Sequence, residues 1–227
     1  MSEYEFGKSI STGESFKFDK SEGLNRIRVD LIWRGEADLD VCAFLVGDDG
    51  LLNHREDFVF YNSENRWLPS SEENVTEGKI EPFDIHIHRT KKNWKKITVP
   101  VSSDLSVIGS PDIKGNEDES DEVHCETLHV VLDRVSLNTR AIIFCGAIYN
   151  APNARIITFG EVKEPAIIIT DEDTDESLCR YDIKDNFAEE TALEAGQIII
   201  SDEGEWTFEP LGKGYTGGIK TLATIYE

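Results

Sequence analysis

The stretch Asn25-Arg26-Ile27-Arg28-Val29-Asp30-Leu31-Ile32-Trp33 alternates between polar and apolar side chains over most of its length. Side chains of a β-strand point to opposite faces of the sheet in turn, so this alternation predicts a strand with one buried and one polar face. The shorter stretch Glu14-Ser15-Phe16-Lys17-Phe18 repeats the pattern and predicts a second strand of the same kind.

The rest of the chain continues as short strands separated by turns. Strands are predicted over residues 41–46, 58–61, 83–88, 96–101, 123–132, 140–149, 166–170, 178–181, 195–201 and 206–210. Helical periodicity is scarce, and we expect short helices over 151–159 and 219–226. This pattern predicts an all-β fold, a two-sheet β-sandwich with a few short helices. It disfavours a doubly wound parallel sheet, in which helices of about 10–15 residues alternate with the strands.

The length of 227 residues favours a single domain over residues 1–227 that carries one insertion. Residues 64–108 hold seven basic and seven acidic residues and are neutral, whereas the whole chain carries a formal net charge of −22. Within this segment, residues 84–88 and 97–101 flank a basic stretch. We therefore predict an inserted β-hairpin with a basic tip, forming a subdomain over 64–108.

The charge balance restricts the partners of the protein. With 45 acidic against 23 basic residues, the chain repels nucleic acid and anionic membranes and attracts cations or basic proteins. The sequence holds no run of about 18 apolar residues, and its acidic beginning does not resemble a signal peptide. The cysteines lie far apart and form no CxxC, which is typical of reduced thiols: Cys42, Cys125, Cys145 and Cys179. We therefore expect a cytoplasmic protein without a membrane span.

Acidic residues concentrate in the predicted loops. Three clusters lie beside apolar strands: Asp38 with Asp40, Asp57 with Asn62, and Asp112 with the run 116–122. Crowded carboxylates repel one another, and calcium, which prefers about six to eight oxygen ligands, removes that repulsion. The pattern predicts a cation site, with a solvated acidic surface as the alternative.

A fourth acidic cluster, 171–176, has the spacing of an EF-hand calcium loop at Asp171, Asp173 and Asp175. Glu176 occupies the sixth position, where that loop needs glycine, and Asp182 the twelfth, where it needs glutamate. The flanking segments also read as strands rather than helices. The sequence therefore excludes an EF-hand and predicts a solvated hairpin turn, with a weak cation site as the alternative.

The remaining polar motifs identify no catalytic site. Five zinc-binding side chains lack the spacing of a zinc loop, so packing residues are favoured over a zinc site: His86, His88, His124, Cys125 and His129. The glycine-rich stretch 212–218 lacks the order of a phosphate-binding loop and predicts a tight turn. Neither GxSxG nor HExxH occurs. We predict that the protein is not an enzyme, with a metal-dependent hydrolase that uses the same acids as the alternative.

The tip of the predicted hairpin is a candidate partner-binding surface. Five basic residues and one tryptophan lie in a segment without acidic residues: Arg89, Lys91, Lys92, Trp94, Lys95 and Lys96. Such a segment can stack on an anion and neutralise it. We expect it to bind an acidic protein surface, including that of a second copy of the chain, with a solvated hairpin end as the alternative.

Several segments together resemble the TerD family of tellurite-resistance and stress proteins. The stretch Asp57-Phe58-Val59-Phe60-Tyr61-Asn62 matches the family motif DFVFYN and is the most specific of them. The others are, in order, Asp38-Leu39-Asp40-Val41-Cys42-Ala43-Phe44-Leu45, the acidic run from Gly115 to Glu122, Phe159-Gly160-Glu161-Val162, Leu178-Cys179-Arg180-Tyr181-Asp182-Ile183, Glu190-Thr191-Ala192 and Gly214-Tyr215-Thr216-Gly217-Gly218. Their order is that of the family over nearly the whole chain.

The resemblance implies a two-sheet sandwich whose loops at one end bind two calcium ions. Carried over position by position, the implied ligands are Asp38, Asp40, Asp57, Asn62, Asp112, Asp118, Asp121 and Glu122. The resemblance also implies a role in stress response and tellurite resistance through other proteins, including members of a tellurite-resistance complex or further copies of the chain. Two departures leave a metal-free assembly module as the alternative. Ser120 replaces an aspartate of the acidic loop, and residues 64–108 have no counterpart.

Overall fold

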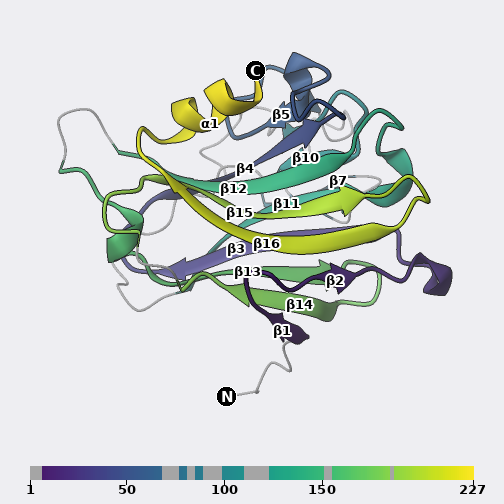
Figure 1. Ribbon diagram of the computed structural model, residues 1–227, viewed down its shortest axis with the longest axis horizontal. Helices are drawn as coiled ribbons and strands as arrows, with labels where there is room; N and C mark the ends of the chain where they lie inside the picture. The colour runs from purple at the N-terminus through teal and green to yellow at the C-terminus, as the bar shows by residue number, and fades with distance from the viewer. Residues whose placement is uncertain are drawn as a thin grey trace.

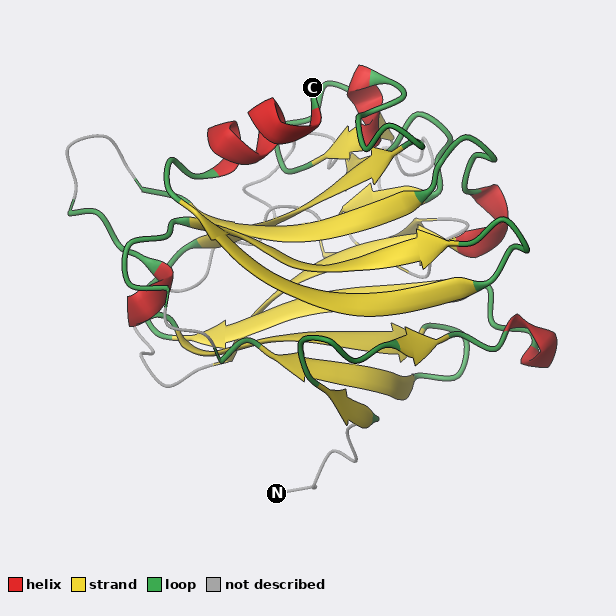
Figure 2. Cartoon of the chain, in the orientation of Figure 1, coloured by secondary structure: helices red, strands yellow, loops and turns green. Residues whose placement is uncertain are grey.

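The computed structural model describes residues 7–67, 77–80, 85–88, 99–109, 123–150, 155–184 and 187–227. In this part of the chain two six-stranded sheets pack face to face, as Figure 1 shows. The helices are short and lie outside the two sheets (Figure 2). The predicted all-β sandwich is confirmed. Within the described residues, no helix is both long and apolar enough to cross a membrane.

The two sheets are built mainly from antiparallel pairs. The first runs in the order β1 (Lys8–Ile10), β14 (Glu176–Asp182), β13 (Lys163–Asp171), β3 (Arg26–Arg34), β11 (Val123–Val131) and β10 (Val107–Gly109). The second runs in the order β2 (Phe16–Lys17), β16 (Trp206–Tyr215), β15 (Ala192–Ile200), β12 (Ala141–Ile148), β4 (Leu39–Val46) and β5 (Phe58–Val59). The pair of β1 with β14 is parallel.

The alternating stretch of β3 forms part of the inner face of the first sheet. Ile27, Val29 and Leu31 are at most 1% exposed, and Trp33 is 5% exposed. They belong to one hydrophobic core that fills the space between the two sheets. Each large apolar side chain buried in this way contributes about 1.5–3 kcal/mol, so this core is the main source of stability.

A second apolar layer lies on the outer face of the second sheet. The helix α1 (Ile219–Tyr226) covers this face, and its Leu222 and Tyr226 are buried there (Figure 1). Cys42 and Phe44 of β4 lie in the same cluster. Because β4 is covered on both faces, it is a continuous apolar run rather than an alternating one. The helix predicted over 219–226 is confirmed.

The helix predicted over 151–159 is wrong in its described part. Residues 155–158 are not helical, and only the 3-10 helix η4 (Phe159–Glu161) follows them. The amide side chain of Asn150 explains the difference. Its Oδ1 accepts from Ile157 N at 2.8 Å and its Nδ2 donates to Ile157 O at 3.1 Å, so these side-chain bonds hold the segment as a loop. The other 3-10 helices are η1 (Lys20–Glu22), η2 (Arg55–Asp57) and η3 (Leu132–Arg134).

The insertion contains a β-hairpin, but its strands differ from those predicted. The strand β8 (Ile85–His88) pairs with β7 (Glu77–Ile80), which precedes it. The strand β9 (Val99–Pro100) pairs instead with β6 (Arg66–Trp67). Within the described residues, no pairing of 84–88 with 97–101 is seen, and residues 84 and 97–98 lie outside them. A nearer partner closes a shorter loop at lower entropic cost, which favours the observed pair.

Several strand ends also differ from the sequence-based expectation. The strand β5 ends at Val59 instead of residue 61, because Ser63 folds the chain back. Its hydroxyl accepts from Phe60 N and donates to Phe58 O, both at 3.0 Å. The short strands β1 and β10 were not expected. β1 and β2 lie at the same edge, one in each sheet, so the segment between them crosses from the first sheet to the second (Figure 1).

Candidate functional site

The predicted ligands occupy two opposite ends of the sandwich. We call the end at which β4 begins the Asp38 end and the end at which β4 finishes the Asp57 end. Asp57 adjoins Phe58, which pairs with Phe44 of β4. At about 3.3 Å per residue along a strand, Asp38 and Phe44 lie about 20 Å apart. The structure therefore does not bring Asp57 together with Asp38.

At the Asp38 end, two predicted ligands lie at the start of β4. Asp38 is exposed and Asp40 is half-buried. The Asp38 carbonyl accepts from Tyr149 N at 2.8 Å, and Asp40 pairs with Ala147 of β12. Asp40 alternates with the core-facing Leu39 and Val41, so its side chain lies on the outer face of the second sheet.

Glu126 of β11 also belongs to this end, and the sequence analysis missed it. Its Oε2 accepts from Val41 N at 2.9 Å, which ties the start of β4 in the second sheet to β11 in the first. The sequence indicates that Glu126 occupies a core-facing position, but not which residue it contacts. Glu126 stands in the same alternating register as Leu128 and Val130, which face the core.

The acid-rich segment joins the sandwich at the same end. Asp112, Asp118, Asp121 and Glu122 lie outside the described residues. Val123, which follows Glu122 in the chain, pairs with Arg34 at the end of β3. Four residues after Arg34, the chain reaches Asp38. Among the described residues, no group of three or more histidine, cysteine, aspartate or glutamate side chains is arranged to hold a metal. A metal at the Asp38 end would therefore need ligands from the acid-rich segment.

At the Asp57 end, the carboxylate of Asp57 builds a loop. It is 3% exposed and accepts from His54 N at 3.1 Å, from Ser103 N at 3.3 Å and from Ser103 Oγ at 2.6 Å. Burial raises the pKa of Asp57, hydrogen bonds from Ser103 oppose the rise, and the charge of Asp104 adds to it. Asn62 is exposed in the turn that follows β5.

A pocket of about 300 Å³ opens at the Asp57 end. Three loops line it, and its lining includes Glu56, Asp57, Ser103, Asp104 and Asn138. Asp104 was not predicted as a site residue, because it lies within the neutral segment 64–108 and stands alone there. Its Oδ2 accepts from Ser136 N at 2.8 Å and its Oδ1 from Ser106 N at 2.9 Å.

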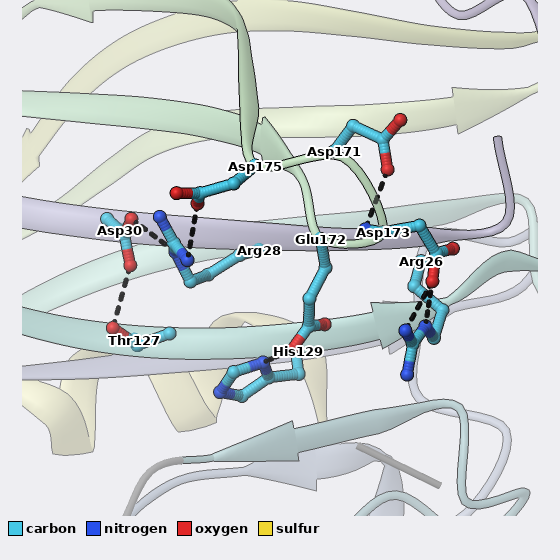
Figure 3. A network of polar contacts seen from close by, with 9 residues as sticks. All are labelled: Arg26, Arg28, Asp30, Thr127, His129, Asp171, Glu172, Asp173 and Asp175. Atoms are coloured by element: carbon cyan, nitrogen blue, oxygen red, sulfur yellow. Dashed lines mark hydrogen bonds and ion pairs between the residues drawn. The ribbon is translucent and has the colours of Figure 1, made fainter. Parts of the chain in front are cut away.

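The fourth acidic cluster forms the turn between β13 and β14, and the structure confirms a hairpin. Figure 3 shows that it folds against the outer face of the first sheet. Arg26 of β3 pairs with Asp173, and Arg28 pairs with Asp30 at 2.9 Å and with Asp175 at 3.3 Å. The turn is therefore held to the sheet by ion pairs, rather than being a purely solvated one.

The described histidines of the zinc alternative have structural partners. His129 Nδ1 lies 2.9 Å from Glu172 Oε1, and both side chains are at most 8% exposed (Figure 3). The ring of His124 stacks on Trp33 with the centroids 5.4 Å apart. These contacts agree with packing residues. The side chains of His86 and His88, and the predicted partner-binding residues Arg89, Lys91, Lys92, Trp94, Lys95 and Lys96, lie outside the described part.

These observations define a two-sheet β-sandwich with acidic loops at both ends. The TerD domain model matches residues 7–107 and 100–226, and the chain belongs to this family. It is 28% identical over 225 residues to the tellurium resistance protein TerD of Serratia marcescens, with 96% of each chain covered. It is 30% identical over 226 residues to general stress protein 16U of Bacillus subtilis (strain 168), again with 96% of each chain covered. The chain is thus a member of a tellurium-resistance and general-stress protein family.

Solved structures share the fold. A homologue of telluride resistance protein (TerD) from Streptomyces coelicolor A3(2) superposes with a TM-score of 0.50 at 17% identity, covering 88% of this chain and 96% of that one. A protein described as being of unknown function superposes with a TM-score of 0.51 at 20% identity, covering 88% and 95%.

Proposed function

We propose that this chain is a calcium-binding module of stress response and tellurite resistance that acts in the cytoplasm by binding other proteins. One observation carries the calcium proposal: Asp38 and Asp40 lie at the end of the sandwich where the acid-rich segment joins β11. The names of the relatives, tellurium resistance protein and general stress protein, suggest the biological setting. The four cysteines, which are all free thiols, agree with a reducing compartment.

The donor set at the Asp38 end fits calcium. Asp38, Asp40, Asp118, Asp121 and Glu122 would supply carboxylate oxygens, the ligands that this ion prefers. When bound, the ion would neutralise charges that otherwise repel one another and would fix the loops that carry them. A fixed loop presents a defined surface to a partner at a lower entropic cost.

The second implied ion has weaker support. Asp57 lies about 20 Å from Asp38 by the rise of about 3.3 Å per strand residue, too far to share an ion with the acids of the Asp38 end. We therefore assign the proposed calcium site to the Asp38 end. We propose a binding rather than a catalytic role, since the names of the relatives refer to tellurium resistance and stress and not to catalysis.

A calcium titration of the full chain followed by thermal unfolding tests the proposal. At a hundredfold excess over the dissociation constant, binding stabilises the folded state by about 2.7 kcal/mol. For a protein of this size, that corresponds to a rise in Tm of about 5–11 °C. Asp40→Asn should lose most of this rise, because it removes one charged ligand.

The matched control is Glu203→Gln, which removes one negative charge in an exposed turn. It should keep the full calcium-dependent rise in Tm. An unchanged Tm of the wild-type chain with calcium and with chelator, together with no heat of binding by calorimetry, would show that the proposal is wrong.

A further inference from the structure

The charged side chains that line the pocket at the Asp57 end are mostly acidic, and His54 is the one basic side chain among the described lining residues. Its lining carries three carboxylates, Glu56, Asp57 and Asp104, and, within the described part of the chain, no lysine or arginine. Arg55, the arginine nearest to the pocket in the sequence, forms an ion pair with Glu64, with 3.7 Å between Nη2 and Oε1. A volume of about 300 Å³ suits one long side chain rather than a cofactor.

Two of these carboxylates are held in place by backbone amides. Asp57 accepts from His54 N and Ser103 N, and Asp104 accepts from Ser106 N and Ser136 N. The negative charges are therefore fixed before any partner arrives, which lowers the cost of binding a cation.

Exposed leucines border the pocket. Leu137 lies between the lining residues Ser136 and Asn138 and is 92% exposed. Leu105 follows Asp104, is 42% exposed and has a φ of +60°, a conformation that leucine rarely adopts. Apolar side chains around a charged contact exclude water from it and strengthen it.

The chain itself carries a segment of complementary charge and character. Five of its 23 basic residues fall between Arg89 and Lys96, with Trp94 among them and no acidic residue. At a net charge of −22, two copies repel each other unless regions of opposite sign meet. The pocket and this segment are such a pair.

We propose that the pocket at the Asp57 end docks the basic segment 89–96 of a second copy of this chain. A lysine or arginine of that segment would place its positive charge beside the carboxylates of Glu56, Asp57 and Asp104. This deepens the proposed function, since it names a partner for a protein-binding module, and it rests on that part of the function alone. It does not depend on calcium at the Asp38 end.

Sedimentation of the full chain over a series of concentrations tests the docking. At low ionic strength, the mass should rise from that of the 25.6 kDa monomer towards the dimer. At about 1 M salt, where the Debye length falls to about 3 Å, the association should weaken strongly. Glu56→Lys should weaken association by about tenfold or more, because it cuts the negative charge of the pocket and places a lysine beside the entering basic side chain. The combined change of Lys91, Lys92, Lys95 and Lys96 to Glu should weaken it at least as much, because like charges then meet.

Mixing the two variants provides the decisive measurement. In the mixture, the native segment of the Glu56→Lys chain meets the native pocket of the other chain, so the mixture should associate more strongly than the reversed-segment variant does alone. Glu203→Lys is the matched charge reversal outside the pocket and should associate like the wild type. Glu56 is exposed, and equal thermal melts would show that its variant folds.

The docking is overturned if the wild-type chain stays monomeric at every concentration, the result expected if the segment docks within its own chain. It is also overturned if either variant associates like the wild type or if the mixture associates no more strongly than the reversed-segment variant alone. The calcium-dependent rise in Tm, measured on the same samples, separates these results from a failure of the calcium site.

Discussion

Asp57 is the first residue of the DFVFYN stretch, yet its carboxylate is 3% exposed and accepts three hydrogen bonds within the loops of the Asp57 end. An aspartate that caps a turn and an aspartate that binds a cation use the same oxygens. The sequence motif therefore could not distinguish the two roles, and the contacts to His54 and Ser103 could.

The raised pKa of Asp57 predicts a pH dependence of stability. The folded-state pKa lies above the ordinary value of 3.8, so the folded chain binds this proton more tightly than the unfolded chain does. This contribution to stability is present below pH 3.8 and is lost as the pH rises through the raised folded-state value. Asp57→Asn cannot ionise and should lack this loss.

Urea unfolding of both proteins over a pH series measures the difference. The informative quantity is the slope of the unfolding free energy with pH, because the substitution also alters hydrogen bonds and so shifts the absolute value. Asp202→Asn removes an aspartate whose side chain is 89% exposed and should keep the wild-type slope. Parallel profiles of the wild type and Asp57→Asn would contradict the prediction.

At the scale of elements, α1 is held down by both apolar and polar contacts. Leu222 is fully buried against the second sheet, and the hydroxyl of Tyr226 donates to Glu194 Oε1 at 2.6 Å. The hydroxyl of Tyr215 donates to the same oxygen at 2.7 Å, and Lys213 Nζ lies 3.3 Å from the other. Burial, followed by the bond to Glu194, raises the pKa of Tyr226. The partners of Glu194 thus compensate for burying a carboxylate beneath the helix.

Leu222→Ala should loosen this helix. Truncating a fully buried leucine costs about 2–5 kcal/mol of unfolding free energy, measured by urea denaturation. The thiols of Cys42 and Cys145, buried in the same cluster, should react faster with Ellman's reagent, while the exposed Cys125 serves as the internal standard.

Ile225→Ala on the same helix is the matched control for this change. Ile225 is 38% exposed, so the loss should be well below that of Leu222→Ala, and the buried thiols should keep their slow reaction. Equal losses in the two variants would show that α1 does not depend on its buried face.

The elements that the sequence predicted best are those whose pattern is set by burial. The alternation of β3 and the apolar run of β4 follow directly from having one or two covered faces. The strand β10 has three residues and depends on its pairing with β11, so its own sequence carries little signal. A period of two identifies β8 as a strand but does not identify its partner, so its pairing with β7 could not be predicted from the pattern.

The candidate site was likewise predicted only in part. Asp38 and Asp40 could be found because acids stand immediately before an apolar strand. Glu126 and Asp104 could not be found in this way, because their roles depend on chain segments far away in sequence. Glu126 meets Val41, 85 positions away, and Asp104 meets Ser136, 32 positions away.

At the scale of the whole molecule, two acidic ends of the sandwich lie at opposite ends of β4. The net charge of −22 is shared by both, and each proposal neutralises a part of it with a different cation. Calcium would act at the Asp38 end, and the basic segment of a second copy would act at the Asp57 end. Long-range electrostatics is the simplest way in which the two events could influence each other.

Combining Asp40→Asn with Glu56→Lys tests whether calcium binding and self-association influence each other. At about 0.15 M salt the Debye length of about 8 Å is well below a separation of about 20 Å, so the charges at the two ends are largely screened from each other. The double variant should lose both the calcium-dependent rise in Tm and the self-association, with a coupling energy within about 0.5 kcal/mol of zero.

At about 0.01 M salt the Debye length of about 30 Å exceeds the separation, and calcium should then strengthen association measurably by reducing repulsion between copies. A coupling energy that persists at the higher salt would instead require a mechanical link through the strands, because screened charges could no longer account for it.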